Sequence, residues 1–146
     1  MTSQKTLTTT IITVTIVCLL LTLATLGVLG APKGTGNVNT INVNLYSDPS
    51  CTIKCTSINW ENIRPNSAIN KTLYIKNSGN TTITLSMSTK NWNPKGANSE
   101  LQLSWNLNNY RLSVEKVVPA TLTLTATSNI ANLTNFKFTI IITGTQ

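Results

Sequence analysis

The sequence predicts an all-β domain that follows a hydrophobic N-terminal segment. Two observations support this prediction. From about residue 37 onward, apolar side chains alternate with threonine, asparagine or lysine in one run after another, which is typical of strands with one buried and one solvated face. Clusters of Gly, Pro, Asn and Ser separate these runs, and no comparable helical period occurs after residue 36.

The first predicted element is a hydrophobic helix at the N-terminus. Residues 11–29 form a run without charge, proline or side-chain amide. About 19 such residues can cross a hydrocarbon core of about 30 Å, so residues 1–30 are predicted to be a signal peptide or a transmembrane anchor. Cleavage before Ala31 and retention both stay open. Because the short leader with Lys5 suits the cytoplasm, the rest of the chain is expected outside, either tethered to the cell membrane or secreted to the cell surface after cleavage.

Composition restricts the kind of protein. The chain has 146 residues, of which 10% are charged, and it contains no histidine. Residues 31–36 are predicted to be a short flexible tether and residues 37–146 to be one domain, because the remaining length suits a single core. The net charge is +7, but the lysines are scattered singly and form no basic run, so nucleic acid is not expected as a partner.

The alternating runs are predicted to be strands, taken here in chain order. The first covers residues 37–47 and places Ile41, Val43 and Leu45 on one face. The buried faces of the later strands are expected to hold Leu73 and Ile75; Ile83, Leu85 and Met87; Leu101, Leu103 and Trp105; Leu122, Leu124 and Ala126; and Phe136, Phe138, Ile140 and Ile142.

Turn residues separate these strands at regular intervals. Asp48-Pro49-Ser50 ends the first strand, and Arg64–Ser67 precedes the next long one. Asn77–Asn80 is expected to join two strands as a hairpin, with Gly79 at positive φ, and Asn93–Gly96 is a further loop. About seven short strands with turn signals every 8–12 residues or so predict an immunoglobulin-like β-sandwich.

The order of these motifs is familiar. A short Ile58-Asn59-Trp60 strand, the Arg64–Ser67 turn, a long strand, the Asn77–Asn80 turn and the closing run Thr134–Gly144 follow one another. This layout resembles that of small archaeal exported or membrane-anchored immunoglobulin-like proteins. The sequence of leader, N-terminal strand and core is also similar to the camelysin and TasA family, whose members form surface fibres by strand exchange. The resemblance implies a shape and a location, and it implies no catalytic activity.

Two cysteines follow the first predicted strand. Cys51 and Cys55 lie in a loop-like stretch, and outside the membrane two such thiols are expected to form a disulfide. Zinc binding would need further ligands, and the chain has no histidine and no third cysteine outside the leader. No metal or other cofactor is therefore expected.

Three sequons and six large aromatic residues are the other candidate sites. Asn70, Asn80 and Asn132 each begin an Asn-X-Ser/Thr acceptor for N-glycosylation, and Asn80 in the predicted hairpin is expected to be the best exposed. The aromatic residues are expected mainly in the core, with a glycan-stacking platform as the alternative. They are Trp60, Trp92, Trp105, Tyr46, Tyr74 and Tyr110.

No pattern of residues indicates catalysis. The acids Asp48, Glu61, Glu100 and Glu115 lie in different segments and are expected to be solvated, so an enzyme is not predicted. The sequence instead favours a structural or adhesion module that acts through its surface, with the membrane as partner through residues 11–29 and copies of itself, other surface proteins or glycans as further partners. The alternative is a fibre subunit that donates residues 37–47, with Ile41, Val43 and Leu45, to a neighbour.

Overall fold

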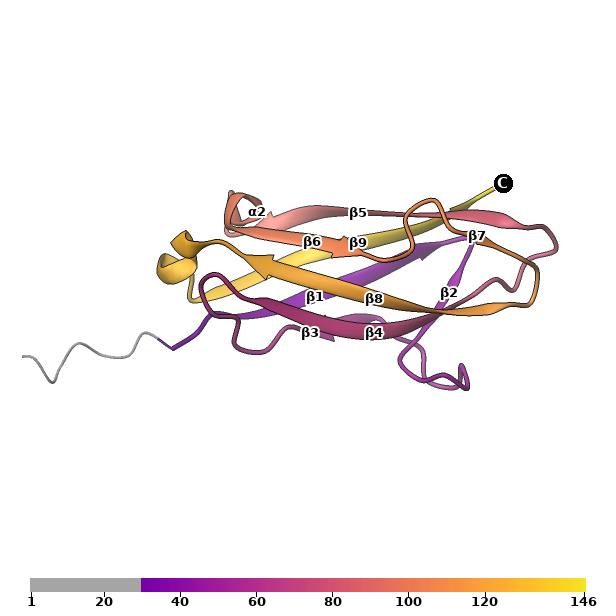
Figure 1. Cartoon of the computed structure of the whole chain (residues 1–146), viewed down its shortest axis with the longest axis horizontal. Helices are drawn as coiled ribbons and strands as arrows, with labels where there is room; N and C mark the ends of the chain where they lie inside the picture. The colour runs from indigo at the N-terminus through magenta and orange to yellow at the C-terminus, as the bar shows by residue number, and fades with distance from the viewer. Residues whose placement is uncertain (1–29) are drawn as a thin grey trace, which may run out of the picture.

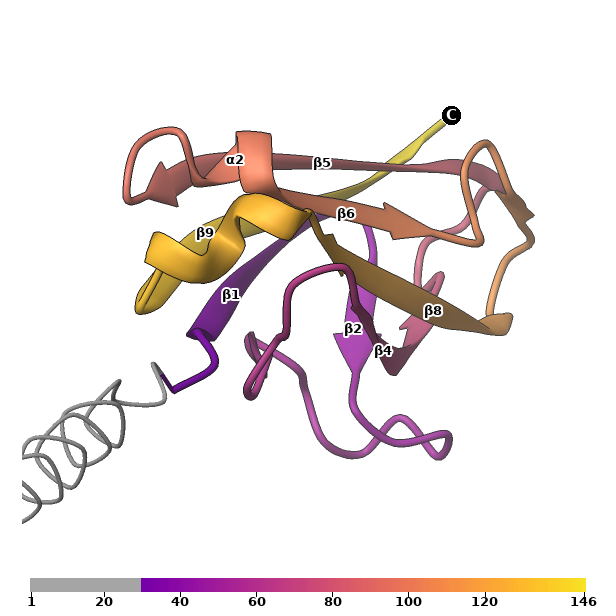
Figure 2. The ribbon, with the colours of Figure 1, turned by 60° about the vertical axis from the view of Figure 1, so that its left-hand side comes forward.

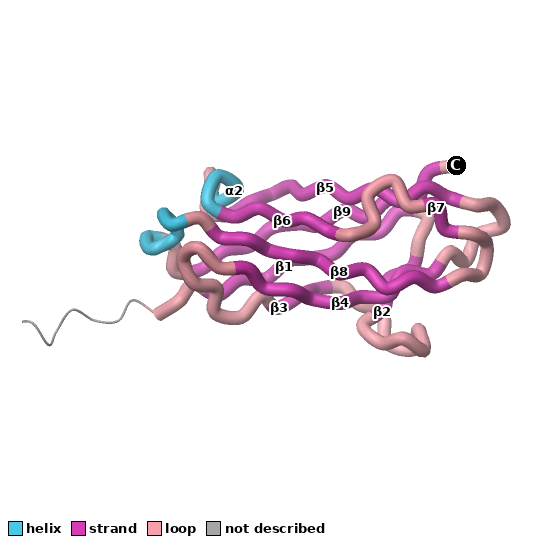
Figure 3. Tube along the Cα trace, in the orientation of Figure 1, coloured by secondary structure: helices cyan, strands magenta, loops and turns pink. Residues whose placement is uncertain are grey.

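The computed structural model describes residues 30–146, apart from the side chains of residues 131 and 132. It is an all-β fold of two sheets that face each other across one core (Figure 1, Figure 3). The predicted hydrophobic helix lies outside the described residues. Between residues 30 and 146, no helix is long and apolar enough to span a membrane.

Sheet A has five strands in the order β3-β1-β9-β5-β7, and sheet B has four in the order β2-β4-β8-β6. The strands of sheet A are β3 (Ser57–Asn59), β1 (Lys33–Ile41), β9 (Asn135–Thr145), β5 (Ile83–Asn93) and β7 (Arg111–Leu112). Those of sheet B are β2 (Asn44–Tyr46), β4 (Ala68–Lys76), β8 (Val117–Ala126) and β6 (Leu101–Trp105). A single helical turn, α2 (Ala97–Glu100), and a 3-10 turn, η2 (Ser128–Asn132), lie at the end where the described chain begins (Figure 2).

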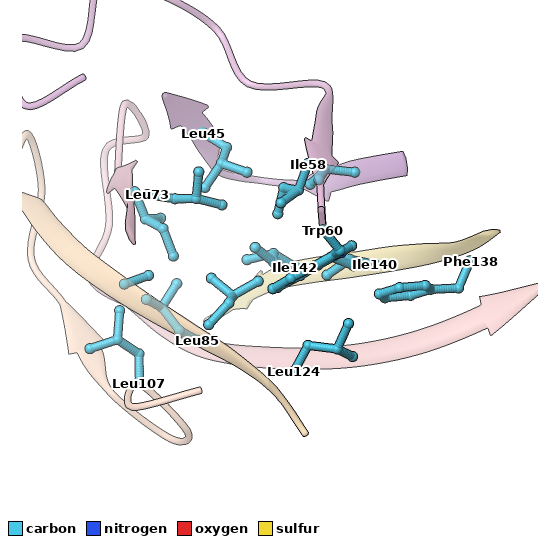
Figure 4. Close-up of a cluster of buried hydrophobic side chains, with 14 of the residues drawn as sticks. Leu45, Ile58, Trp60, Leu73, Leu85, Leu107, Leu124, Phe138, Ile140 and Ile142 are labelled. Carbon is cyan, nitrogen blue, oxygen red and sulfur yellow. The ribbon is translucent and has the colours of Figure 1, made fainter. Parts of the chain in front are cut away.

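The core lies between the two sheets and contains the alternating residues that the sequence placed inside. Figure 4 shows Leu45, Leu73 and Leu124 of sheet B and Leu85, Ile140 and Ile142 of sheet A filling one shared space. The buried faces predicted for β4, β5, β6, β8 and β9 are confirmed, with Met87, Leu103 and Trp105 only partly buried at the margin of the core. Period-two alternation was a sufficient signal for these strands, because each has one face on the core and one in solvent.

The prediction of a single strand over residues 37–47 is wrong. β1 ends at Ile41 in sheet A, and β2 begins at Asn44 in sheet B, so the chain changes sheets between them. Asn42 makes the corner with a φ of 58°, in the left-handed region that asparagine tolerates better than most residues. Its side-chain amide donates to the backbone oxygen of Gly144 on β9, at 3.3 Å.

Two further expectations need correction at the start of the domain and after β4. Residues 33–36, expected in the tether, belong to β1. The Asn77–Asn80 segment is a connection between the sheets and not a hairpin, because β4 lies in sheet B and β5 in sheet A. Gly79 is not at positive φ. Among the glycines of the described chain, the one with a positive φ is Gly96.

Asn77 organises this connection with its side chain. It is fully buried, its Oδ1 accepts from the backbone N–H of Gly79 at 3.0 Å, and its Nδ2 donates to the carbonyls of Thr81 and Leu112 at 2.8 and 3.0 Å. A side chain therefore supplies the hydrogen bonds that a hairpin turn would have supplied from the backbone.

Candidate functional site

The most distinctive feature of the structure is the seat of β1, which we call the β1 slot. β1 is an interior strand of sheet A, with β9 on one side and β3 on the other. It runs parallel to β9 over nine residue pairs, from Lys33 beside Asn135 to Ile41 beside Thr143. The first described strand is thereby paired with the last one, and the pairing brings together segments about as far apart in the sequence as the domain permits.

The other wall of the β1 slot is residues 56–63, which include β3. The backbone N–H of Val38 donates to the carbonyl of Thr56 at 2.8 Å, and that of Trp60 donates to the carbonyl of Gly34 at 2.9 Å. The N–H of Ile63 donates to the carbonyl of Pro32 at 3.0 Å. Hydrogen bonds on both edges therefore hold β1 from its first residue to residue 38, and Pro32 just before it is held as well.

Two glycines on the inner face of β1 fit the floor of this slot. Gly34 and Gly36 are buried, and a Cβ on Gly34 would lie 2.0 Å from Cε2 of Phe136. A Cβ on Gly36 would lie 2.9 Å from Nε1 of Trp60 and 3.1 Å from Cδ1 of Ile140. Since real side chains do not approach so closely, only glycine fits at position 34, and nothing larger fits at position 36 unless its neighbours move.

Phe136, Phe138 and Trp60 lie against the inner face of β1, and Trp92 of β5 joins them in an aromatic stack. The ring centroids of Trp92 and Phe138 lie 4.1 Å apart with planes 7° from parallel, and Trp60 stacks on Phe138 at 6.3 Å. Phe136 completes the group at 6.2 Å from Phe138. The indole N–H of Trp92 donates to Oγ1 of Thr89 at 3.1 Å, whereas that of buried Trp60 has no hydrogen-bond partner among the described residues. Trp60 is therefore a core residue, as expected, and Trp92 packs against the core while staying partly exposed. Tyr110, also expected mainly in the core, is 43% exposed.

The residues expected to form the donor strand do not share one face. The side chain of Ile41 is 50% exposed, while Val43 and Leu45 are buried beyond the corner at Asn42. The inner face of β1 is formed instead by Gly34, Gly36 and Val38. Sequence reasoning missed this face because glycines carry no hydrophobic signal. Their spacing of two residues, in step with Val38, was the available clue.

The two cysteines lie in the loop between β2 and β3. In the structure Cys51 and Cys55 are free thiols that approach different carbonyls, those of Pro49 at 3.9 Å and Ser57 at 3.4 Å. Burial raises the pKa of the Cys55 thiol, because desolvation disfavours the thiolate. The Cys51–Cys55 disulfide stays a prediction.

Asp48 holds the same loop closed. Its carboxylate accepts from the backbone N–H of Ile53 at 2.7 Å, from that of Thr52 at 3.0 Å and from the Thr52 hydroxyl at 2.9 Å. The hydrogen bond from Ile53 is the largest of the effects that hold the pKa of this carboxyl below its usual value, because it favours the charged form.

The remaining acids have local partners. Glu61 pairs with Lys71 at 2.9 Å, and Glu115 pairs with Lys76 at 3.0 Å. Glu100 accepts from the hydroxyls of Ser99 and Thr127. Within residues 30–146 no group of three or more His, Cys, Asp or Glu side chains is close enough to hold a metal ion.

The sequons differ in their settings. Asn70 is exposed on the outer face of β4, where its Oδ1 accepts from the hydroxyl of Thr123 at 2.8 Å. Asn80 is exposed in the connection between β4 and β5, and Asn132 ends η2 with a side chain outside the description. Glycosylation of these residues stays a prediction.

An open depression lies at the end of the domain away from residue 30. It encloses about 410 Å³ and is lined mainly by neutral polar residues, among them Asn42, Asn44, Ser78, Asn80 and Thr81. Such a surface can exchange hydrogen bonds with a partner, but it has no charged or aromatic side chain to select one.

No family model matches the chain, and no curated protein is detectably similar to it.

Proposed function

We propose that this protein is a non-enzymatic structural or adhesion module of immunoglobulin-like arrangement, displayed outside the membrane beyond the hydrophobic segment at residues 11–29. The observation that carries the proposal is the position of β1. It begins at Lys33, only a few residues after the hydrophobic run, and it is an interior strand with partners on both edges. A domain built in this way follows the membrane boundary directly, without a flexible spacer.

The order of the strands supports the immunoglobulin-like part of the proposal. The order β2-β4-β8-β6 follows the A-B-E-D pattern of one immunoglobulin sheet, and β9 beside β5 follows the F-C pair of the other. β1 occupies the place of strand G, but it is parallel to β9 where strand G would be antiparallel to F. β7 lies beside β5, which occupies the place of strand C, yet in the chain it comes after β6, which occupies the place of strand D. An immunoglobulin strand C′ would come before strand D, so the position of β7 is a second departure from that fold.

The two ends of the domain support display. The described chain enters at one end and β9 leaves at the other, so a domain attached through residue 30 presents its far end outward (Figure 1). That end carries the neutral polar depression around Asn42, Ser78 and Asn80. Asparagine and serine side chains can exchange hydrogen bonds with the hydroxyls of glycans or with polar groups of other surface proteins.

Orientation and retention are tested together in a cell that expresses the full chain with a C-terminal epitope tag. Protease added to intact cells should remove the tag, while a cytoplasmic control protein stays intact. N-terminal sequencing then distinguishes an anchored chain, which keeps residues 1–30, from a chain cleaved before Ala31. A tag that is protected in intact cells and digested only after lysis would contradict display.

The second candidate function is a fibre subunit assembled by strand exchange, and the β1 slot favours it. The segment that would be exchanged is β1, residues 33–41, and not residues 37–47. Its inner face is small, its attachment depends largely on backbone hydrogen bonds, and only residues 42 and 43 connect it to β2. A β1 strand from another copy would meet the same partners.

Cross-linking distinguishes the two candidates. Cysteines replace Thr35 and Lys137, which are neighbours across β1 and β9, in a chain whose native cysteines are serines, and a short bismaleimide joins them. A self-paired domain should give a cross-linked monomer, and a fibre should give a ladder of oligomers on a denaturing gel. Asn70 and Thr123, which are neighbours across β4 and β8, form the control pair and should give a monomer in both cases.

A further inference from the structure

We propose that the β1–β9 ladder is a mechanical clamp, which makes the domain resistant to tension applied between its two ends. The first observation is directional. β1 and β9 are parallel, so the start of β1 and the end of β9 lie at opposite ends of the ladder. Figure 1 shows the described chain entering at one end and the C-terminus leaving at the other.

Tension between residue 30 and residue 146 therefore pulls β1 and β9 past each other along their common axis. The hydrogen bonds of a ladder run across the strands, so this tension loads all nine residue pairs together, in shear. An antiparallel pair that is pulled apart from one shared end loses its bonds one after another. Shear is the stronger geometry, because no bond can break before the others are strained.

The second edge of β1 adds to this resistance. The bonds from Val38 to Thr56, from Trp60 to Gly34 and from Ile63 to Pro32 also run across the direction of pull. To withdraw β1, the tension must break the bonds on both of its edges.

The side chains on the inner face of β1 oppose sliding in the direction of the pull. Withdrawal of β1 by two residues, about 6.6 Å, brings Val38 to the place of Gly36. That place has no room even for a Cβ, which would lie 2.9 Å from Nε1 of Trp60 and 3.1 Å from Cδ1 of Ile140. Val38 thus acts as a wedge, and Trp60 and Ile140 are the stop against which it is pulled.

The use of this clamp in the cell rests on the proposed function, because tension requires attachment at the membrane side and a contact at the far end. The clamp itself is a property of the fold. It is measured on purified protein, so it can fail while display is correct, and it can hold while display is wrong.

The experiment is single-molecule force spectroscopy on the full chain in detergent micelles, in two pulling geometries. Handles on the two ends of the chain load β1 and β9 in shear. Handles on position 80 and the C-terminus load the antiparallel β5–β9 pair from its shared end, where Thr84 faces Thr145. We expect the end-to-end rupture force to be several-fold higher at the same loading rate, and equal or lower end-to-end force would overturn the proposal.

A matched pair of variants tests the wedge. Val38→Gly should lower the end-to-end force and leave the force from position 80 unchanged. Val43→Gly removes a valine of similar burial outside the ladder and should leave the end-to-end force near that of the wild type. An equal loss of end-to-end force in both variants would overturn the role of Val38. If either variant does not fold, the comparison of the two geometries in the wild type still decides the proposal.

Discussion

Gly34 and Gly36 determine which residues of the N-terminal strand can face the aromatic floor of the β1 slot. A shift of β1 by two residues in the direction of withdrawal would bring Val38 against Trp60 and Ile140, and a shift the other way would bring Pro32 against Phe136. A shift by one residue would turn polar side chains such as Asn37 inward. The glycines therefore specify the register of a strand whose own hydrophobic pattern is weak.

Gly34→Ala should destabilise the domain, because its Cβ would overlap the ring of Phe136. Overpacking of this kind costs about 1–3 kcal/mol, and more where the neighbours cannot move. Urea denaturation of the full chain in detergent, followed by tryptophan fluorescence, measures the loss. Gly30→Ala is the control, since nothing lies within 4 Å of its added Cβ. An unchanged unfolding midpoint in Gly34→Ala would contradict the fit described for this slot.

Acid should open the loop that Asp48 closes. The folded-state pKa of Asp48 is lowered, so its contribution to stability is present above the ordinary pKa of an aspartate and is lost as the pH falls through the lowered value. The protection factors for hydrogen exchange at the backbone amides of Thr52 and Ile53 should therefore be smaller at low pH than at neutral pH. In Asp48→Asn the protection should be weaker than in the wild type at neutral pH and should not change as the pH falls, because the side chain keeps one acceptor oxygen but carries no charge. A wild-type loop that stays protected below the aspartate range would contradict this role.

The thiols give a third prediction at this scale. In protein recovered from an oxidising compartment, a bridge between Cys51 and Cys55 should lower the intact mass by two hydrogens relative to the reduced sample. In the reduced protein, Cys55 should alkylate slowly at neutral pH, because burial raises its pKa and the thiolate is the reacting form. Peptide mapping identifies the residues, and two freely alkylated thiols in unreduced, unfolded protein would contradict the bridge.

At the scale of elements, hydrophobic periodicity revealed four of the long strands and none of the shortest ones, and β3 was expected only as the short Ile58–Trp60 strand of the resemblance. β4, β5, β8 and β9 each repeat an apolar residue at every second position often enough to reveal their buried faces. β2, β3 and β7 have only two or three residues each, which is too few for a period to be seen. These three lie at the edges of the sheets, where short strands limit pairing with other chains.

The β1 slot was predictable only in part, for a physical reason. The sequence marks a strand near Val38, but the glycines before it suggest flexibility when they are considered alone. Their role depends on Phe136 and Trp60, which are distant in the sequence and reach the slot only in the folded domain. The corner at Asn42 was missed because the alternation of Ile41, Val43 and Leu45 continues through it without interruption.

The connection between β4 and β5 depends on Asn77. Asn77→Ala should leave the carbonyls of Thr81 and Leu112 and the N–H of Gly79 without their partner. Loss of a buried polar partner costs about 1–3 kcal/mol, so a decrease in the free energy of unfolding of that size is expected in urea titrations. Asn108→Ala changes an exposed asparagine and should be nearly neutral. Equal effects of the two substitutions would contradict the assigned role of Asn77.

At the scale of the whole molecule, one core joins both sheets, and its members come from every long strand. Because β1 pairs with β9, the edge of β1 that faces β9 has no partner until this last strand has formed. Its other wall, residues 56–63, provides only a short pairing. The sheet is therefore completed by the most distant segments of the chain.

This topology predicts a domain that unfolds in one step and folds slowly for its size. Tryptophan fluorescence, which reports on Trp60 and its stack, and the sheet signal in the amide I infrared band should give the same unfolding midpoint, because neither sheet has a core of its own. Folding should take milliseconds to seconds or so, since non-local strand pairs dominate and their loop-closure entropy must be overcome first. Stopped-flow refolding of the full chain in detergent measures the rate. A variant with Thr35→Pro, which removes a backbone donor inside the β1 slot, should refold more slowly or not at all. The control is Ser113→Pro, which places a proline in the exposed segment after β7. Two separated midpoints in the wild type, with the fluorescence change preceding the loss of sheet, would contradict a single cooperative unit and would show that β1 leaves its slot before the rest of the domain unfolds.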